Sequence, residues 1–295
     1  MTFLIILFAI GLQIFLTYKK VSPFLSLLIV AIVAGLCLGM TPDAILASIQ
    51  KGVGSTLGGL ALIICLGAVL GKILEISGAA EQIATTLING FGRKYIQWAV
   101  LVTGFLIGIP LYYNAGFVIL VPLVFTLARK TGLPLLYIAI PMAASLSTTH
   151  CFLPPHPSPV FLINAFHANT GKVLIYGLII SIPVVILAGP VLGRLLQKIK
   201  VEINDPLLPD ESEKEKKLPE VFASFFIALL PVLLITLAVI ASNFLPDETI
   251  LKKVLLFIGD STIALLLAVL VATWYFGIQA GHSIEIVMKW LNEAI

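Results

Sequence analysis

An uncharged, proline-rich stretch at residues 131–171 limits the folds open to this chain more than any other feature. It contains no Asp, Glu, Lys or Arg, and its middle, residues 148–159, contains Pro154, Pro155, Pro157 and Pro159. Proline removes a backbone donor and disfavours helical geometry in the residue before it. Irregular backbone at membrane depth is stable only where it is buried in protein or lines a watery cavity. We therefore expect the 148–159 loop to lie in the protein interior.

The composition supports this placement in a bilayer. The 295 residues are 59% hydrophobic and 11% charged, with a mean hydropathy of +1.10, whereas soluble domains are about 25% charged. The chain is therefore predicted to be a polytopic membrane protein surrounded by lipid. Its net charge of +3 is too small to indicate a nucleic-acid partner. An odd number of cysteines in apolar surroundings (Cys37, Cys65 and Cys151) argues against a disulfide framework.

The hydrophobic pattern predicts an all-α fold with about eight transmembrane helices. The expected apolar segments cover residues 3–18, 21–40, 53–74, 95–128, 135–147, 173–196, 221–245 and 251–276. Amphipathic helices are expected at 41–51, 81–92 and 284–291. Because one helix spans a bilayer with about 20 residues, the 34 uncharged residues of 95–128 are predicted to form two shorter helices. These helices would meet at an unwound centre near 108–116, where Gly, Pro and Asn gather.

We expect one membrane domain over residues 1–295, organised in three parts. Residues 1–92 form N-terminal helices, 93–171 form broken helices with a re-entrant substrate-site region, and 172–295 form further spans with a soluble loop at 198–220. The positive-inside rule places Arg93 and Lys94, Arg129 and Lys130, and the 198–220 loop on the cytoplasmic side. That placement requires 95–128 to cross twice or to re-enter.

The 148–159 loop has the chemistry of a binding site for a polyhydroxylated carboxylate. Ser147, Thr148 and Thr149 supply hydroxyl groups, and His150 and His156 supply imidazoles that change charge near neutral pH. Helix ends beside the loop would present N–H groups to an anion. The alternative is a kinked buried helix whose hydroxyls bond to its own backbone. A metal site formed by His150, Cys151 and His156 is disfavoured because no second ligand cluster accompanies it.

Two further polar residues lie in apolar segments. Asn114, at the 108–116 break, would either bind substrate hydroxyls or satisfy backbone groups freed by the break. Asp260 would either carry a proton or cap the helix that begins near Ser261. The candidates for proton coupling are therefore His150, His156 and Asp260.

An enzyme is not predicted. The chain has no Gly-x-Ser-x-Gly, His-Glu-x-x-His or phosphate-binding glycine-rich motif, and no cofactor or metal is expected. An intramembrane hydrolase built on a Ser/His pair of the loop is the weaker alternative.

The loop sequence STTHCFLPPHPSP, at 147–159, resembles the signature loop of the gluconate permease family of proton symporters. The segments at 67–72, 108–123 and 141–145 also resemble that family. The resemblance implies a secondary active transporter of the bacterial inner membrane that imports gluconate or a related sugar acid with protons. It also implies an ion-transporter superfamily fold with inverted repeats and re-entrant hairpins. Asn114, Ser147, Thr148, Thr149, His150 and His156 would bind the substrate.

The chain departs from the family pattern in several places. Asn114 stands where many relatives carry an acid, and Cys151 and Ser158 stand where the family often has glycine. Relatives are also longer, so this chain is expected to be the first part of an inverted-repeat transporter. The alternatives are a transporter of another small hydroxy-acid or D-amino acid, and a truncated fragment that does not transport. Assembly into a homo-oligomer is compatible with each of these.

Overall fold

The computed structural model describes residues 2–199 and 218–294. Most of the loop predicted at 198–220 therefore lies outside the described residues. The chain divides into two compact units, residues 1–59 and 60–295, and each is described here by itself. The division falls within helix α3 (Pro42–Ile76). It does not test the three-part organisation expected from the sequence, which stays a prediction.

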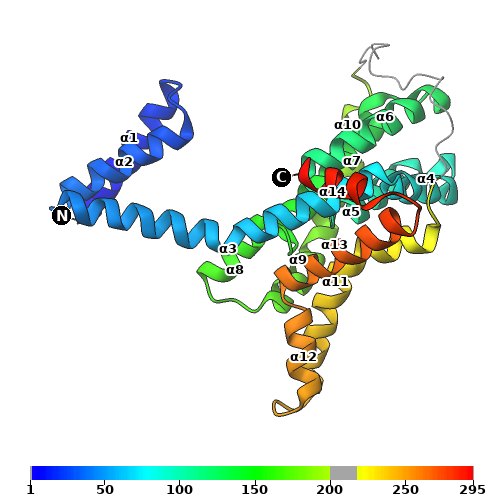
Figure 1. Cartoon of the computed structure of the whole chain (residues 1–295). Helices are drawn as coiled ribbons and strands as arrows, with labels where there is room; N and C mark the ends of the chain where they lie inside the picture. Colours follow the sequence, from blue (N-terminus) through cyan, green and yellow to red (C-terminus); the bar gives the residue numbers. More distant parts are fainter. Residues whose placement is uncertain (1, 200–217, 295) are drawn as a thin grey trace. The chain divides into compact units, whose positions relative to one another are not determined.

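The first unit contains α1 (Thr2–Tyr18), α2 (Pro23–Cys37) and the beginning of α3 (Figure 1). Gln13 of α1 donates a 2.9 Å hydrogen bond to the Ser26 hydroxyl of α2. No residue of α1 is buried, which is expected of an apolar helix whose surroundings are lipid. The prediction of separate helices at 41–51 and 53–74 is wrong, because α3 continues through both. Gly52 and Gly54 lower helix propensity there, but a glycine alone does not end a helix.

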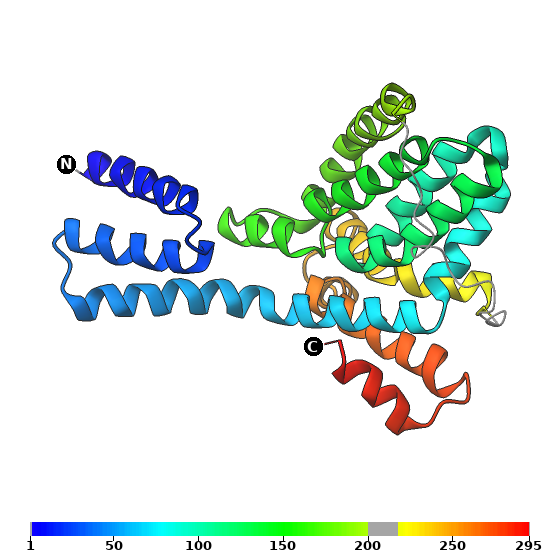
Figure 2. The same cartoon turned by 90° about the horizontal axis from the view of Figure 1, so that it is seen from above.

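The second unit packs the remaining helices around one main apolar core. They are α4 (Ala79–Phe91), α5 (Ile96–Gly108), α6 (Tyr113–Thr131), α7 (Leu135–Phe152), α8 (Pro157–Ala165), α9 (Thr170–Ile186), α10 (Leu192–Leu196), α11 (Val221–Phe244), α12 (Ile250–Ile258), α13 (Ser261–Ala272) and α14 (Ile284–Asn292). Short helical turns at Arg93–Tyr95, Leu187–Val191 and Thr273–Ile278 join or extend them. Helix α5 packs against α4 and α7, and α11 packs against α12 and α13 (Figures 1 and 2).

The predicted fold class, an all-α polytopic membrane protein, is confirmed. Within the described residues, five helices are long and apolar enough to cross a membrane: Pro42–Ile76, Leu135–Ala165, Thr170–Leu196, Val221–Phe244 and Ser261–Ile278. Four shorter apolar helices accompany them, at Thr2–Tyr18, Pro23–Cys37, Ile96–Gly108 and Tyr113–Arg129. The number of spans, the re-entrant turn and the inverted repeat stay predictions.

The break predicted near 108–116 is present but shorter. Helix α5 ends at Gly108 and α6 begins at Tyr113, so residues 109–112 alone separate them. Pro110 lies in this gap, where its missing N–H interrupts no helical ladder. The turn directs the start of α6, with Tyr112, Tyr113 and Asn114, toward the end of α3.

The predicted irregular loop at 148–159 is wrong in its extent. Helix α7 continues to Phe152, so Thr148, Thr149, His150 and Cys151 are helical, and the irregular part is only residues 153–156. The last two prolines of the motif lie in the first turn of α8. A proline is tolerated there because first-turn N–H groups have no helical acceptor. Two of the four prolines therefore start a helix instead of preventing one.

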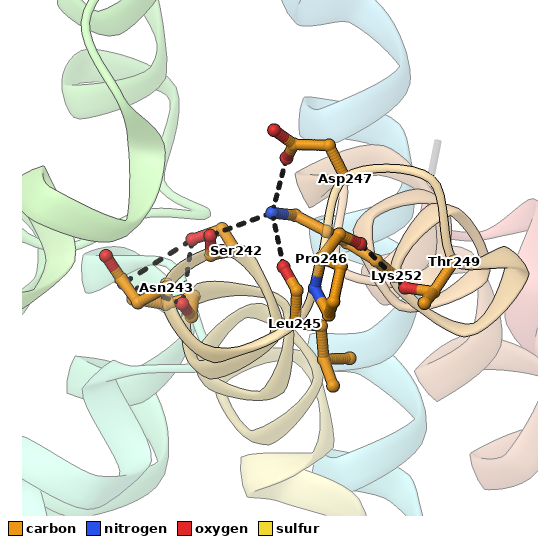
Figure 3. Close-up of polar contacts among 8 residues, drawn as sticks. Ser242, Asn243, Leu245, Pro246, Asp247, Thr249 and Lys252 are labelled. Carbon is orange, nitrogen blue, oxygen red and sulfur yellow. Dashed lines mark hydrogen bonds and ion pairs between the residues drawn. The ribbon is translucent and has the colours of Figure 1, made fainter.

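Lys252 closes the hairpin between α11 and α12 (Figure 3). Its side chain is 10% exposed, and its ammonium donates to the carbonyls of Ser242 and Leu245, at 3.0 and 2.9 Å, and to the Asp247 carboxylate at 2.7 Å. The Ser242 carbonyl belongs to the last turn of α11 and Leu245 is the residue that caps its C-terminal end, where carbonyl acceptors have no helical donor. The hydrogen bond from Lys252 also lowers the pKa of the Asp247 carboxyl.

We expect Lys252→Met to lower the free energy of unfolding by about 1–2 kcal/mol, because it removes a buried charged donor from two carbonyls. Asp247→Asn is the matched control and should have a smaller effect, because the Asp247 side chain is 95% exposed. Thermal unfolding of the purified protein in detergent measures both. If both variants lose the same free energy of unfolding, the ion pair stabilises the hairpin and the bonds from Lys252 to the carbonyls do not.

Candidate functional site

A cavity of about 550 Å³ lies in the second unit, where the end of α3 meets the break between α5 and α6. This volume is in the usual range for small-molecule sites. Its walls come from α3, the start of α6, α7, the start of α8 and the residues that follow α14. The lining residues are Ile64, Ala68, Lys72, Glu75, Tyr112, Tyr113, Asn114, Ala115, His150, Pro157, Glu293 and Ala294. Figure 2 shows α14 beside the C-terminal end of α3.

The sequence analysis singled out two of these lining residues, Asn114 and His150. Asn114 is exposed to the cavity at the second position of α6. His150 is half-buried, and its Nδ1 is buried without a hydrogen-bond partner among the described residues. A buried ring nitrogen without a partner is costly unless a ligand or water satisfies it. The cavity therefore presents an amide and an imidazole, both able to bond to a hydroxyl or carboxylate group.

Three rings form one cluster at the wall of the cavity. The His150 ring centroid lies 4.8 Å from that of His156 and 5.9 Å from that of Tyr112, and the last two are 6.0 Å apart. The Tyr112 hydroxyl lies 2.9 Å from the carbonyl of Ile63 and 3.0 Å from that of Ile64 on α3. Gly67 makes room for this contact, since a Cβ there would lie 2.7 Å from the Tyr112 hydroxyl. Tyr112 therefore fixes the break against α3.

His156 holds the two broken helices together. Its ring is buried, and its Nε2 lies 2.7 Å from the carbonyl of Gly108, the last residue of α5. A carbonyl only accepts hydrogen bonds, so Nε2 carries the hydrogen and donates it. His156 does not line the cavity. Its place in substrate or proton binding stays a prediction, while its contact with Gly108 gives it a structural role.

The hydroxyls of α7 bond to their own helix. Thr148 donates to the carbonyl of Ala144 at 2.7 Å, and Thr149 lies 3.1 and 2.9 Å from the carbonyls of Ser145 and Leu146. Both threonines are buried, Ser147 is exposed, and none of the three lines the cavity. This is the arrangement that the alternative interpretation of the motif anticipated. Substrate contact by Ser147, Thr148 and Thr149 stays a prediction.

Asp260 caps the N-terminus of α13, which is one of the two roles that the sequence predicted for it. Its carboxylate accepts hydrogen bonds from the N–H groups of Thr262 at 2.9 Å and Ile263 at 3.4 Å. Asp260 is exposed and does not line the cavity. Proton coupling through Asp260 stays a prediction. Within the described residues, no group of three or more His, Cys, Asp or Glu side chains is placed to hold a metal ion.

The sequence analysis missed two charged residues of the cavity. Lys72 and Glu75 lie near the end of α3, with their charged atoms 3.7 Å apart and their side chains 32% and 37% exposed. They are the only charged residues in the otherwise apolar segment 52–80. That isolation was the available signal, because charges within a membrane segment usually face a cavity or a partner. A charge near the end of a span also suits the lipid interface, which is why the pattern alone did not identify them.

Comparison with known proteins agrees with this architecture. The family model described as GntP family permease matches residues 1–295. The chain is 46% identical to a high-affinity gluconate transporter and 44% identical to the Gnt-II system L-idonate transporter, both of Escherichia coli (strain K12); each match covers 94% of the chain and 63% of the relative. It is 41% identical to the gluconate permease of Zymomonas mobilis over 94% of the chain and 62% of the relative. No solved structure gives a significant match.

The chain thus spans slightly less than two thirds of the curated relatives it matches. The family match nevertheless covers the whole chain, and the apolar helices described above agree with it. The protein is a multi-pass membrane protein that belongs to the GntP permease family.

Proposed function

We propose that this protein imports gluconate or a related sugar acid by symport with protons across the bacterial inner membrane. The observation that carries the proposal is the cavity of about 550 Å³, which combines a lysine, an amide and an imidazole at a break in membrane helices. Broken helices around a central cavity are the usual binding architecture of secondary transporters. The relatives support the substrate class, since they are named as transporters and permeases of gluconate or L-idonate.

The lining groups suit an acid that carries several hydroxyls. Lys72 offers a cation for a carboxylate, and Asn114 offers one acceptor and two donors. The Nδ1 of His150, which has no protein partner in the described structure, bonds to a further hydroxyl in this proposal. Tyr112 and Tyr113 supply aromatic walls against which the carbon chain of the substrate packs. We infer that Asn114 and His150 are substrate-binding residues.

The test is uptake of radiolabelled gluconate by cells that lack their own gluconate permeases and express the full-length protein. We expect accumulation that is abolished by a protonophore and inhibited by unlabelled gluconate. Asn114→Ala and His150→Ala should each reduce uptake severalfold, while the exposed Asn243→Ala on α11 should not. Failure of the wild type to accumulate gluconate, with the protein present in the membrane, would contradict the proposal.

L-idonate is the second candidate substrate, because one relative that is 44% identical bears that name. Gluconate and L-idonate differ in the configuration of hydroxyl-bearing carbons and share the carboxylate. Competition against labelled gluconate separates them: the preferred acid inhibits at the lower concentration. D-serine and glycerate belong in the same panel as examples of a D-amino acid and a smaller hydroxy-acid.

A further inference from the structure

Two charged residues face the cavity as a pair whose members belong to one helix. The Nζ of Lys72 and the Oε2 of Glu75 are 3.7 Å apart, a loose ion pair between residues three positions apart on α3. Among the described residues that line this cavity, Lys72 is the only lysine or arginine. Each side chain is about one third exposed, so neither is sealed from a ligand.

We propose that Lys72 binds the carboxylate of the substrate, and that Glu75, its counter-ion in the empty cavity, takes up the transported proton when the substrate displaces it. The inference rests on the proposed function, a sugar acid imported with protons. It gives a lysine and an acid of α3 a part in the two tasks, substrate binding and proton coupling. The sequence pattern had assigned these tasks to other residues: Asn114, Ser147, Thr148, Thr149, His150, His156 and Asp260.

Charge balance in the membrane links substrate binding to proton binding. Without substrate, the cation of Lys72 and the anion of Glu75 neutralise each other. A substrate carboxylate on Lys72 leaves Glu75 without its cation, and an ionised carboxylate that lacks a partner is unfavourable within a membrane segment. One proton from the medium, bound to the Glu75 carboxylate, restores neutrality and releases Lys72 for the substrate. When the substrate leaves, Glu75 loses the proton and returns to Lys72.

Other ionisable groups also line this cavity. Glu293, which follows α14, lies 3.9 Å from Lys289 and has its own counter-ion. His150 of α7 is neutral when it accepts a substrate hydroxyl through Nδ1. Tyr112 donates to backbone carbonyls of α3, and the ring of Tyr113 stacks on that of Phe117. Glu75 is the acid closest to the only lysine of the cavity.

The first experiment measures binding of radiolabelled gluconate to the purified full-length protein, with sorbitol, the polyol that lacks the carboxylate, as competitor. We expect Lys72→Met to raise Kd about tenfold or more, as loss of a charge-assisted hydrogen bond does. It should also remove the preference for gluconate over sorbitol. Lys72→Arg should retain much of both. Lys172→Met, at an exposed lysine of α9 outside the cavity, should match the wild type.

The second experiment follows Kd with pH, where one linked proton changes Kd by up to about tenfold per pH unit. Binding that takes up a proton weakens as pH rises, so the wild type should lose affinity from acid to alkaline pH. Glu75→Gln imitates the protonated acid and should bind gluconate at all pH values with the affinity of the acid-side wild type. Glu81→Gln, at an exposed acid of α4, should keep the wild-type pH profile.

The outcomes separate the two proposals. A wild type that binds neither gluconate nor L-idonate contradicts the proposed function and the inference with it. If the wild type binds gluconate and Lys72→Met binds it with the same Kd, the role of Lys72 is overturned while the proposed function stands. The pair is then an ordinary ion pair near a helix end. A pH profile that is flattened by His150→Gln and unchanged in Glu75→Gln moves the proton site to His150 and overturns the assignment of Glu75.

Discussion

Replacement of His156 by alanine is expected to lower the free energy of unfolding by about 3 kcal/mol and to abolish most of the uptake. The ring is 3% exposed, and its centroid lies 4.8 Å from that of His150 and 6.0 Å from that of Tyr112. Its removal leaves a void and deprives the carbonyl of Gly108 of its 2.7 Å donor. Large-to-small changes in a core cost a few kcal/mol, and an unsatisfied buried acceptor adds to that cost. Thermal unfolding in detergent and the amount of protein in the membrane measure the effect.

His156→Gln is the matched comparison, because its amide nitrogen can still donate to the carbonyl of Gly108. We expect this variant to recover much of the stability lost in His156→Ala. If it is stable and still transports, the part of His156 is structural. Stability with complete loss of uptake would instead support the prediction that His156 binds substrate or proton. A His156→Ala protein as stable as the wild type would contradict the structural role.

Gly108→Ala is expected to destabilise the protein by about 2 kcal/mol, the typical cost of overpacking in a well-packed core. A Cβ at this position would overlap the Thr149 hydroxyl and lie 3.2 Å from Leu146. Thr149 cannot easily give way, because it is fully buried and its hydroxyl bonds to the preceding turn. The measurement is again thermal unfolding, together with the fraction of protein that remains monodisperse in detergent.

The second change Thr149→Ala makes this prediction specific. It removes the overlapping hydroxyl, so the double variant should be more stable than the sum of the two single changes predicts. Gly90→Ala on α4, where nothing lies within 4 Å of the added methyl, is the control and should be neutral or slightly stabilising. Strictly additive losses at positions 108 and 149 would show that the two residues are not in the contact described.

Local chemistry explains which structural features were predictable. The cap at Asp260 joins groups two or three residues apart, as does the cap at Ser22, which accepts from Leu25. The break between α5 and α6 follows from Gly, Pro and Asn within a few residues. Such features depend on neighbours in the chain, so the pattern contains the information. The wrong extent of the 148–159 loop has a local cause too: proline was treated as helix-breaking at every position, although it is tolerated in a first turn.

The site was less predictable because its groups come from distant segments. Asn114 and His150 were identified, since polar groups in uncharged segments are rare. Thr148 and Thr149 carry hydroxyls of the kind that line sugar-binding sites. A hydroxyl on a helix is equally able to bond to a carbonyl of the preceding turn. Both threonines do so. Residue type alone does not distinguish these two uses.

The class of the protein, a polytopic α-helical membrane protein that resembles the gluconate permease family, was predictable from the sequence alone, because hydropathy and a short proline-rich motif depend only on the order of residues. Which groups share a cavity depends on how the helices pack. Lys72 and His150 belong to different helices, and packing of the α5–α6 break against α3 brings them to one surface. The same packing places the His156 ring within hydrogen-bond distance of the Gly108 carbonyl. Such contacts arise from helix packing, whose geometry depends on side chains far apart in the chain.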